Sequence, residues 1–380
     1  MRVAVDYTSA IRQGGGIGRY TRELIAALLA ASHPHTFTLM AAVAGKRAAW
    51  NAAAARLGDR ATLRPLPLTD DWMARLWQRL RLPLPAEWLT GPVDCFYSPD
   101  FVLPPLRRAT RALLTVHDLS FLRHPETFTP ALRAYLERSV PRSVTRADHV
   151  FADSHATRAD LIALLDVPPE RVTTLHCGVS ARFTPQEAPG ERERLAAQYG
   201  VGARPYILAV GTVQPRKNYI RLMTACDALV SGRDLDLVIA GGSGWLAEAI
   251  LEAAAQRPYV RITGFFADGD LPALYRQAAL LAFPSIYEGF GLPPLEAMAC
   301  GTPVVASTAS SVPEAVGDAG LQVDPHDSAA WTAALARALD DAELRAHLRE
   351  AGLARAATFT WVRAARHWLD TLAAITGNAV

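Results

Sequence analysis

The sequence predicts an α/β protein built from two doubly wound parallel sheets in tandem. Short apolar segments typical of buried strands alternate with helical patterns, and this alternation favours parallel strands joined by right-handed crossovers. The alternation restarts after a polar, helix-breaking stretch at 186–190, and 380 residues exceed one ordinary core. We therefore expect an N-terminal domain over 1–186, a second domain over 187–360 and a final helix within 361–380.

Six strands are predicted in the first half. They cover residues 2–7, 36–43, 93–98, 112–116, 149–153 and 172–175. A glycine-rich loop, 14–16, follows the first strand and precedes a helix with one apolar side. A dinucleotide-binding fingerprint fits this loop poorly, because Arg19 occupies the third glycine position. Two interpretations stay open for Gly15 and Gly16, either a flexible turn or backbone that approaches a phosphate or an acceptor.

Residues 70–81 predict an amphipathic helix that carries tryptophan and arginine. Trp72, Leu76 and Leu80 fall on one side of it, and three arginines supply charge. In the simplest interpretation this helix packs on its own domain. Because tryptophan and arginine also suit the depth of lipid headgroups, the alternative is that it docks the protein on an anionic membrane surface.

A histidine follows the strand predicted at 112–116. His117 therefore stands at the carboxyl end of a parallel strand, where open α/β sheets bind their ligands. This position favours a functional role over a purely structural one. The next residue, Asp118, either contacts an acceptor or caps the following segment. Ser154 precedes a helical pattern and is interpreted as its N-cap.

Six further strands are predicted in the second half, over residues 206–210, 235–240, 259–263, 280–283, 303–306 and 321–323. The stretch 284–307 holds two carboxylates, Glu288 and Glu296, with seven residues between them. A glycine loop there leads into a helix that Pro293 and Pro294 can begin and Gly301 can end. The N–H groups and the positive dipole at such a helix start bind anions. Carboxylates on both sides of an anion site suit a nucleotide sugar, whereas glycoside hydrolysis would need both to face one bond at ~5–10 Å.

Composition excludes several other classes of protein. A formal net charge of +2 gives no nucleic-acid signal. No apolar run approaches the roughly 20 residues of a membrane-spanning helix. Because the first predicted strand starts at residue 2, we expect no signal peptide before it. The four cysteines are far apart, which supports neither a zinc ribbon nor a disulfide scaffold. We expect a cytoplasmic protein, with a position on the inner face of the membrane as the alternative for 70–81.

The segment EGFGLPPLEAMACGTPVV, residues 288–305, resembles the E-x7-E signature of the large retaining glycosyltransferase family 4. The segment TVHDLSF, residues 115–121, with His124, Pro125 and Glu126, resembles the mannosyltransferase-B-like branch of that family. The resemblance implies the GT-B fold, in which two Rossmann-like domains face a cleft and a last helix crosses back to the first domain.

The resemblance also implies roles for individual residues. Arg216 and Lys217 match the pair that neutralises the leaving diphosphate, and His117 and Glu288 would face the donor sugar. Glu296 would bind the ribose hydroxyls. The remaining donor-binding positions implied are Gly15, Gly16, Gly264, Phe265, Gly289, Phe290, Gly291 and Leu292, with Asp118 as a possible acceptor contact. No metal and no permanently bound cofactor are expected, because these cations would take the place of a metal.

The function implied is transfer of a hexose, with mannose from GDP-mannose favoured, to a glycan or lipid-linked oligosaccharide during cell-surface polysaccharide synthesis. A UDP-glucose (or other nucleotide-hexose) dependent transferase is the close alternative. An NAD-dependent Rossmann oxidoreductase or a non-catalytic sugar-binding protein would use a similar sheet and are the remote alternatives.

Overall fold

A computed structural model describes residues 1–377 of the chain, and its contacts divide the chain into two compact units. Unit 1 consists of Met1–Leu119, Ala134–Gly178 and the described part of 361–380, and unit 2 consists of Ser120–Arg133 and Val179–Thr360. The division therefore falls at 178/179, a few residues before the expected 186/187, and it assigns 120–133 to unit 2. Residues 378–380 of the expected final segment lie outside the described residues.

Unit 1 contains a seven-stranded sheet in which every pair of neighbours is parallel. Its order is β3 (Thr62–Leu66), β2 (Thr36–Ala42), β1 (Arg2–Asp6), β4 (Cys95–Ser98), β5 (Arg111–Val116), β6 (His149–Ala152) and β7 (Val172–Thr174). The strand order reverses direction at β1 and β4, so the sheet is doubly wound, as predicted. The carboxyl ends of β1, β4, β5 and β6 consequently lie side by side.

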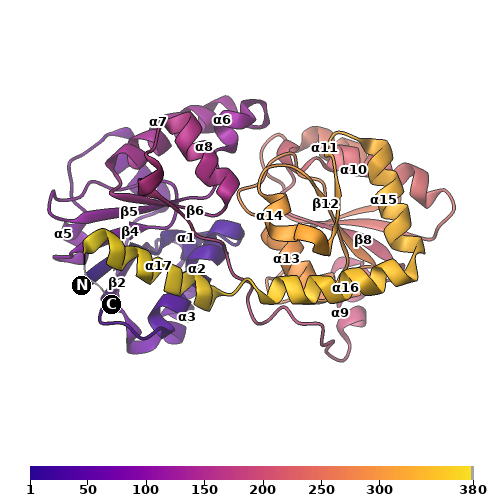
Figure 1. Cartoon of the computed structure of the whole chain (residues 1–380), viewed down its shortest axis with the longest axis horizontal. Coiled ribbons are helices and arrows are strands. Elements are labelled where there is room, and N and C mark those ends of the chain that lie inside the picture. Colours follow the sequence, from indigo (N-terminus) through magenta and orange to yellow (C-terminus); the bar gives the residue numbers. More distant parts are fainter. Residues whose placement is uncertain (378–380) are drawn as a thin grey trace. The chain divides into compact units, whose positions relative to one another are not determined.

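Helices cover both faces of this sheet. They are α1 (Thr8–Arg12), α2 (Gly16–Ala30), α3 (Arg47–Leu57), α4 (Asp70–Ala74), α5 (Glu87–Thr90), α7 (Pro130–Arg146), α8 (His155–Leu165) and α17 (Trp361–Thr376). In Figure 1, α7 and α8 cover one face, whereas α2, α3 and α17 cover the other. The last helix, α17, packs on α2 and thus returns to unit 1, which confirms that part of the GT-B expectation.

Two elements of unit 1 differ from the sequence prediction. Strand β3 was not predicted, because it is an edge strand that includes Pro65 and is largely exposed rather than apolar. The helix expected over 70–81 is α4 followed by a π-helical turn, Arg75–Arg79. The wider π turn places Trp77 and Gln78 inward together, and their side chains donate to the carbonyls of Leu84 and Leu103, each at 3.0 Å.

Unit 2 contains a six-stranded parallel sheet. Its order is β10 (Val260–Gly264), β9 (Asp236–Ala240), β8 (Tyr206–Val210), β11 (Leu280–Phe283), β12 (Val304–Ser307) and β13 (Leu321–Val323). The order reverses between β8 and β11, so the loops that follow these two central strands meet at the point where doubly wound sheets bind ligands.

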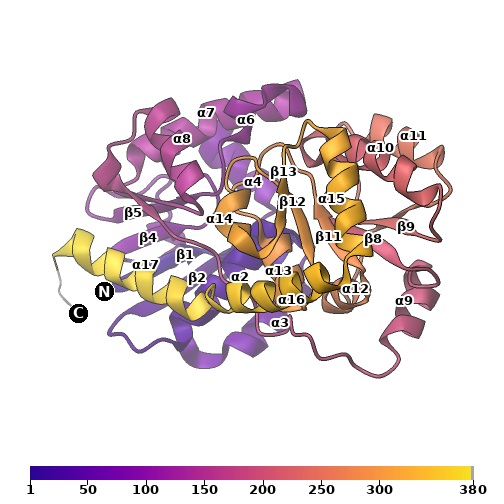
Figure 2. The same ribbon diagram turned by 45° about the vertical axis from the view of Figure 1, so that its right-hand side comes forward.

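Helices lie on both faces of the second sheet as well. The set is α9 (Glu191–Tyr199), α10 (Tyr219–Val230), α11 (Glu248–Ala255), α12 (Leu271–Gln277), α13 (Leu292–Ala299), α14 (Val312–Val316), α15 (Ser328–Asp340) and α16 (Ala342–Ala357). One face carries α10, α11 and α15 over a core that includes Trp331, and the other carries α12, α13 and α16 (Figure 2).

The segment Ser120–Arg133, which contains α6 (Ser120–Arg123), packs on unit 2 through aromatic side chains. The indole N–H of Trp245 donates to the carbonyl of Thr127 at 2.7 Å, and its ring stacks on Phe128 at a centroid distance of 5.6 Å. The His124 ring lies 5.7 Å from the Tyr287 ring. Unit 2 is therefore assembled from two separate parts of the chain.

Among residues 1–377, none of the helices combines the length and the hydropathy that crossing a lipid bilayer requires.

Candidate active site

Two cations follow the first strand of unit 2. Strand β8 ends at Val210, and a 3₁₀ turn, Pro215–Lys217, then carries Arg216 and Lys217 to the switch point of the sheet. Asn218 stands in the left-handed region at φ 58°, where its amide donates to the carbonyls of Pro284 and Pro325. At Gly211, a Cβ atom would come within 2.9 Å of the Lys217 side chain. Glycine at position 211 therefore leaves space for the side chain of Lys217, which is only 8% exposed.

Glu288 binds both cations. Its Oε1 lies 2.6 Å from Lys217 Nζ and its Oε2 lies 3.0 Å from Arg216 Nη1. Burial by itself would raise the pKa of the Glu288 carboxyl, but the charges of Arg216 and Lys217 outweigh it and hold that pKa at about 2. Glu288 is therefore ionised at every physiological pH, and the cluster of three groups carries one net positive charge inside a buried site.

The Glu288 loop continues into helix α13. Gly291, at φ 115°, is the N-cap residue, a conformation that L side chains rarely adopt. Leu292 opens the helix, and the two prolines stand in its first turn, as predicted. Prolines carry no N–H group, and the Leu295 N–H makes the first helical hydrogen bond, so the backbone donors at this end come from Gly289 to Leu292. Gly301, at φ 76°, follows the end of the helix, also as predicted.

Glu296 lies one turn into α13 and is 1% exposed. Its Oε2 accepts a hydrogen bond of 2.9 Å from the hydroxyl of Tyr275, which comes from α12. The two carboxylates of the E-x7-E segment therefore have different partners, because Glu288 binds cations and Glu296 binds a hydroxyl. The assignment of Glu296 to a ribose stays a prediction.

Gly264 and Phe265 lie farther along the same edge of the sheet. Gly264 ends β10 at φ 68°, and Phe265 is 82% exposed. Because β9 and β8 separate β10 from β11, these two residues are not in the cluster around Glu288. An aromatic ring exposed on a loop at the carboxyl edge is compatible with the donor-binding role that the resemblance implies for Phe265, which also stays a prediction.

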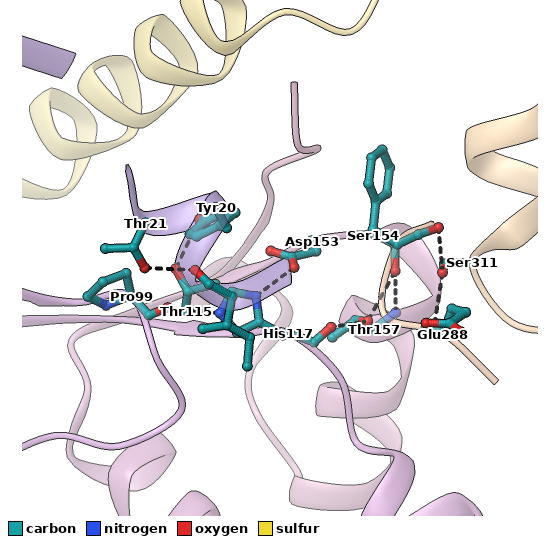
Figure 3. A network of polar contacts seen from close by, with 12 residues as sticks. Tyr20, Thr21, Pro99, Thr115, His117, Asp153, Ser154, Thr157, Glu288 and Ser311 are labelled. Atoms are coloured by element: carbon teal, nitrogen blue, oxygen red, sulfur yellow. Dashed lines mark hydrogen bonds and ion pairs between the residues drawn. The ribbon is translucent and has the colours of Figure 1, made fainter. Parts of the chain in front are cut away.

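In unit 1, His117 follows β5 and is 6% exposed. Its Nδ1 lies 2.7 Å from Asp153 Oδ2 and its Nε2 lies 2.8 Å from the carbonyl oxygen of Pro99 (Figure 3). Both partners accept hydrogen bonds, so both ring nitrogens carry protons. Burial would lower the pKa of His117, but the charge and hydrogen bond of Asp153 outweigh it and raise the pKa to about 9.

The environment of His117 is built by helix α2 and by neighbouring strands. The Tyr20 ring, on α2, meets the His117 ring edge-on at 4.9 Å. The hydroxyls of Tyr20, Tyr97 and Thr115 bond to one another at 2.7–3.1 Å, and Thr157 donates to the His117 carbonyl at 3.2 Å. The expectation that His117 faces a donor sugar stays a prediction; both of its ring N–H groups have protein partners here.

The other predicted residues of unit 1 lie close in sequence to this network. Gly15 is the N-cap of α2 and Gly16 its first residue, and a Cβ atom at either would meet nothing within 4 Å. Backbone at this position can therefore be approached closely. Asp118 is half-buried directly after His117. Ser154 caps α8 by accepting the N–H of Thr157 at 3.0 Å, which confirms its predicted structural role.

Sequence reasoning missed several residues that hold these groups in place. Asp153 could have been found, because it follows the strand next to that of His117 and so shares its edge of the sheet. Tyr275, Ser310 and Ser311 gave no such signal. Their contacts with the two glutamates join residues more than twenty positions apart.

Asp153→Asn is expected to lower the pKa of His117 from about 9 toward 6.5. Since the folded-state pKa exceeds the unfolded value, charged His117 contributes stability that is fully present below pH 6.5 and is lost as pH rises through about 9. The thermal stability of the wild type should fall across that pH window, and that of the variant should fall much less. ¹⁵N NMR titration of the imidazole measures the pKa directly; an unchanged value in Asp153→Asn would contradict the assignment.

Two family models match the chain. The model described as Glycosyltransferase Family 4 matches residues 14–183, and the model described as Glycosyl transferases group 1 matches residues 191–355. Together they cover both halves of the chain, with their boundary close to the passage from unit 1 to unit 2.

Relatives are similar over most of the chain. The O-antigen chain mannosyltransferase B of Escherichia coli is 36% identical over 271 residues, 70% of this chain and 70% of that protein. A D-inositol 3-phosphate glycosyltransferase of Salinispora arenicola is 37% identical over 297 residues, 73% of this chain but only 64% of that protein. The structure of HepE from Anabaena in complex with UDP and glucose matches with a TM-score of 0.75 at 20% identity, over 98% of this chain and 100% of that one. At this identity the structural match shows the fold alone.

Proposed function

The chain belongs to glycosyltransferase family 4 and has the GT-B fold, and from this premise we propose that it transfers a hexose with retention of anomeric configuration. The favoured donor is GDP-mannose, and the proposed acceptor is a hydroxyl of a glycan or lipid-linked oligosaccharide in cell-surface polysaccharide synthesis. The similarity to a mannosyltransferase that acts on O-antigen chains supports this donor and acceptor class. The match to a D-inositol 3-phosphate glycosyltransferase keeps the acceptor class open. A UDP-hexose stays the competing donor.

The cluster of Arg216, Lys217 and Glu288 is the observation that carries the proposal. Two cations, nearly buried at the switch point of a parallel sheet and beside a helix N-terminus, suit a leaving diphosphate. In a buried site their charges are screened less by water than they would be on the surface. We propose that they, rather than a metal ion, neutralise the diphosphate. Arginine offers a planar fork to two phosphate oxygens and lysine a point charge.

In the proposed reaction, the bond between the anomeric carbon and the phosphate oxygen breaks, and the diphosphate leaves with the electron pair. The acceptor hydroxyl attacks the anomeric carbon from the same face, and its proton passes to the leaving phosphate oxygen. Arg216, Lys217 and the backbone donors of α13 stabilise the charge that develops on the diphosphate. Glu288 stays ionised throughout, so it can accept hydrogen bonds from donor-sugar hydroxyls. No protein nucleophile is assigned.

A thermal-shift panel with GDP, UDP, ADP and NAD tests the class of enzyme and the base of the donor nucleotide together. A nucleotide present at 100 times its Kd should stabilise the folded chain by about 2.7 kcal/mol. We expect GDP to stabilise most, and UDP in its place would select the competing donor. Stabilisation by NAD alone would overturn the proposal in favour of an oxidoreductase. Binding of GDP-mannose without transfer to any glycan acceptor would favour a non-catalytic sugar-binding protein.

Contact of residues 70–81 with a membrane belongs to the same proposal. Trp72 and Leu80 are 51% and 64% exposed, and the Arg75 guanidinium lies 5.2 Å from the centre of the Trp72 ring. Met73 and Trp77 point inward, so they do not belong to this exposed face. Replacing Trp72 and Leu80 with serine should reduce co-sedimentation with vesicles that contain anionic lipid at least severalfold. Undiminished co-sedimentation, with neutral vesicles as the control, would exclude this surface.

A further inference from the structure

The loop after β12 holds the backbone of Glu288 through two serines. The Ser310 hydroxyl accepts a hydrogen bond from the Glu288 N–H at 2.7 Å and donates one to the Glu288 carbonyl at 2.8 Å. The Ser311 hydroxyl, fully buried, is shared between the carbonyls of Glu288 and Phe290 at 2.8 and 3.0 Å (Figure 3). Both polar groups of the Glu288 backbone are therefore bound by side chains that lie 22 or 23 residues later in the sequence.

The conformation of Ser310 is unfavourable for a residue with a side chain. Its φ is 46°, in the left-handed region, which costs an L residue of this kind free energy that glycine would not incur. Such strain persists only where surrounding contacts hold it, and it concentrates at functional sites. A glycine here would relieve the strain but would lack the hydroxyl. The two bonds to Glu288 are the contacts that the hydroxyl supplies.

Holding the backbone on both sides of the Glu288 Cα has a direct effect on the charged cluster. A glutamate has three rotatable side-chain bonds, so the position of its carboxylate depends on where its Cα and peptide plane are held. In Glu288 each carboxylate oxygen meets a different cation, Lys217 on one side and Arg216 on the other. A displacement of about 1 Å away from either cation would stretch that contact beyond hydrogen-bond length. Arg216 also donates to the carbonyl of Tyr287, so the peptides on both sides of the Glu288 Cα are held.

We propose that Ser310 is a positioning residue for Glu288, whose hydroxyl fixes the Glu288 peptide so that the carboxylate engages Arg216 and Lys217 at once. The expected effect of Ser310 on turnover rests on the proposed transferase function. The expected effect of Ser310 on the ionisation of Glu288 does not rest on that function. The two consequences can therefore be measured separately.

Three variants test the proposal. Ser310→Gly removes the hydroxyl and relieves the backbone strain. Ser310→Asn keeps a donor and an acceptor on a residue that tolerates the left-handed region. Ser307→Ala is the matched control at the end of β12, directly before this loop. Among the described residues, the Ser307 hydroxyl has one hydrogen bond, which it accepts from the nearby Ala309 N–H at 3.4 Å.

The readouts are the pKa of the Glu288 carboxyl by ¹³C NMR, with its signal assigned through Glu288→Gln, and kcat, KM and Tm. For Ser310→Gly we expect a pKa raised above the wild-type value of about 2, kcat reduced about tenfold, KM for the donor changed less than about twofold, and Tm within about 2 °C of wild type. Ser310→Asn should recover most of kcat, and Ser307→Ala should match wild type.

The outcomes separate the two proposals. A wild-type pKa for Glu288 in Ser310→Gly overturns the positioning role, whether or not the chain transfers sugar. Equal losses of kcat in Ser310→Gly and Ser307→Ala also overturn it, because a general loosening of the loop would then be the cause. If the wild type transfers no hexose from any nucleotide sugar, the proposed function fails, and the NMR titration alone decides the role of Ser310.

Discussion

Lys217→Ala is expected to lower kcat/KM for hexose transfer by about three orders of magnitude. The change removes a cation from the diphosphate site, and one well-placed electrostatic contact to a developing charge contributes about 10²–10³-fold. It also leaves Glu288 buried with Arg216 as its one remaining cation partner among the described ion pairs. The pKa of Glu288 should then rise from about 2, because burial favours the neutral carboxyl. Initial rates with GDP-mannose and a glycan acceptor measure the loss.

The chain offers a matched control for this variant, since it contains two lysines. Lys46 is exposed at the start of α3, so Lys46→Ala removes the same charge from the surface and should leave kcat/KM unchanged. Lys217→Arg should retain part of the activity, because the charge stays but the longer planar group does not fit beside Gly211. Activity of Lys217→Ala within about threefold of wild type would show that the diphosphate is bound elsewhere.

Trp368→Ala is expected to lower the free energy of unfolding of unit 1 by about 3–5 kcal/mol, the range for removing a large buried aromatic side chain. Trp368, on α17, is fully buried and packs against Phe37, Tyr97 and Phe151 at centroid distances of 5.3–6.4 Å. Its removal leaves a cavity among rings contributed by three strands. Urea denaturation followed by far-ultraviolet circular dichroism measures the change.

Trp368→Phe provides the comparison. The indole N–H of Trp368 has no hydrogen-bond partner in the described part of the chain, so phenylalanine loses volume but no polar contact. We expect Trp368→Phe to lower the free energy of unfolding by less than half as much as Trp368→Ala does. The surface variant Val362→Ala, on the exposed side of the same helix, should change stability by less than about 0.5 kcal/mol. Because alanine forms helices more readily than valine, a similar loss in Val362→Ala would mean that the loss in Trp368→Ala does not come from removing a packed ring.

Much of the fold could be predicted because parallel strands buried on both faces are continuous apolar runs. Strands such as β5, β8 and β11 are recognisable for this reason, and they fixed the doubly wound class. Strand β3 has no such run, since it lies at the sheet edge with one neighbour. The π-helical turn after α4 was equally hidden, because its geometry depends on the carbonyls of Leu84 and Leu103, outside the helix, that accept from Trp77 and Gln78.

The candidate site could be predicted where its chemistry follows directly from local order in the chain. Arg216, Lys217, Glu288 and Glu296 stand on loops after strands or on the helix that follows, which the sequence reveals. The partners that set the state of each group could not be predicted in the same way. Glu288 binds both cations, and His117 donates from both ring nitrogens. Both arrangements depend on contacts between separate strand ends.

The return of α17 to unit 1 determines when each unit can finish folding during synthesis. The aromatic core around Trp368 includes side chains from β2, β4 and β6, all of which are translated before residue 179. Helix α17, which carries Trp368 and completes this core, is translated only after the whole of 179–360. Until α17 has been made, unit 1 has an uncovered apolar surface, whereas unit 2 has its complete set of strands once β13 has been translated. Unit 1 should therefore depend on chaperone protection during translation and finish folding second.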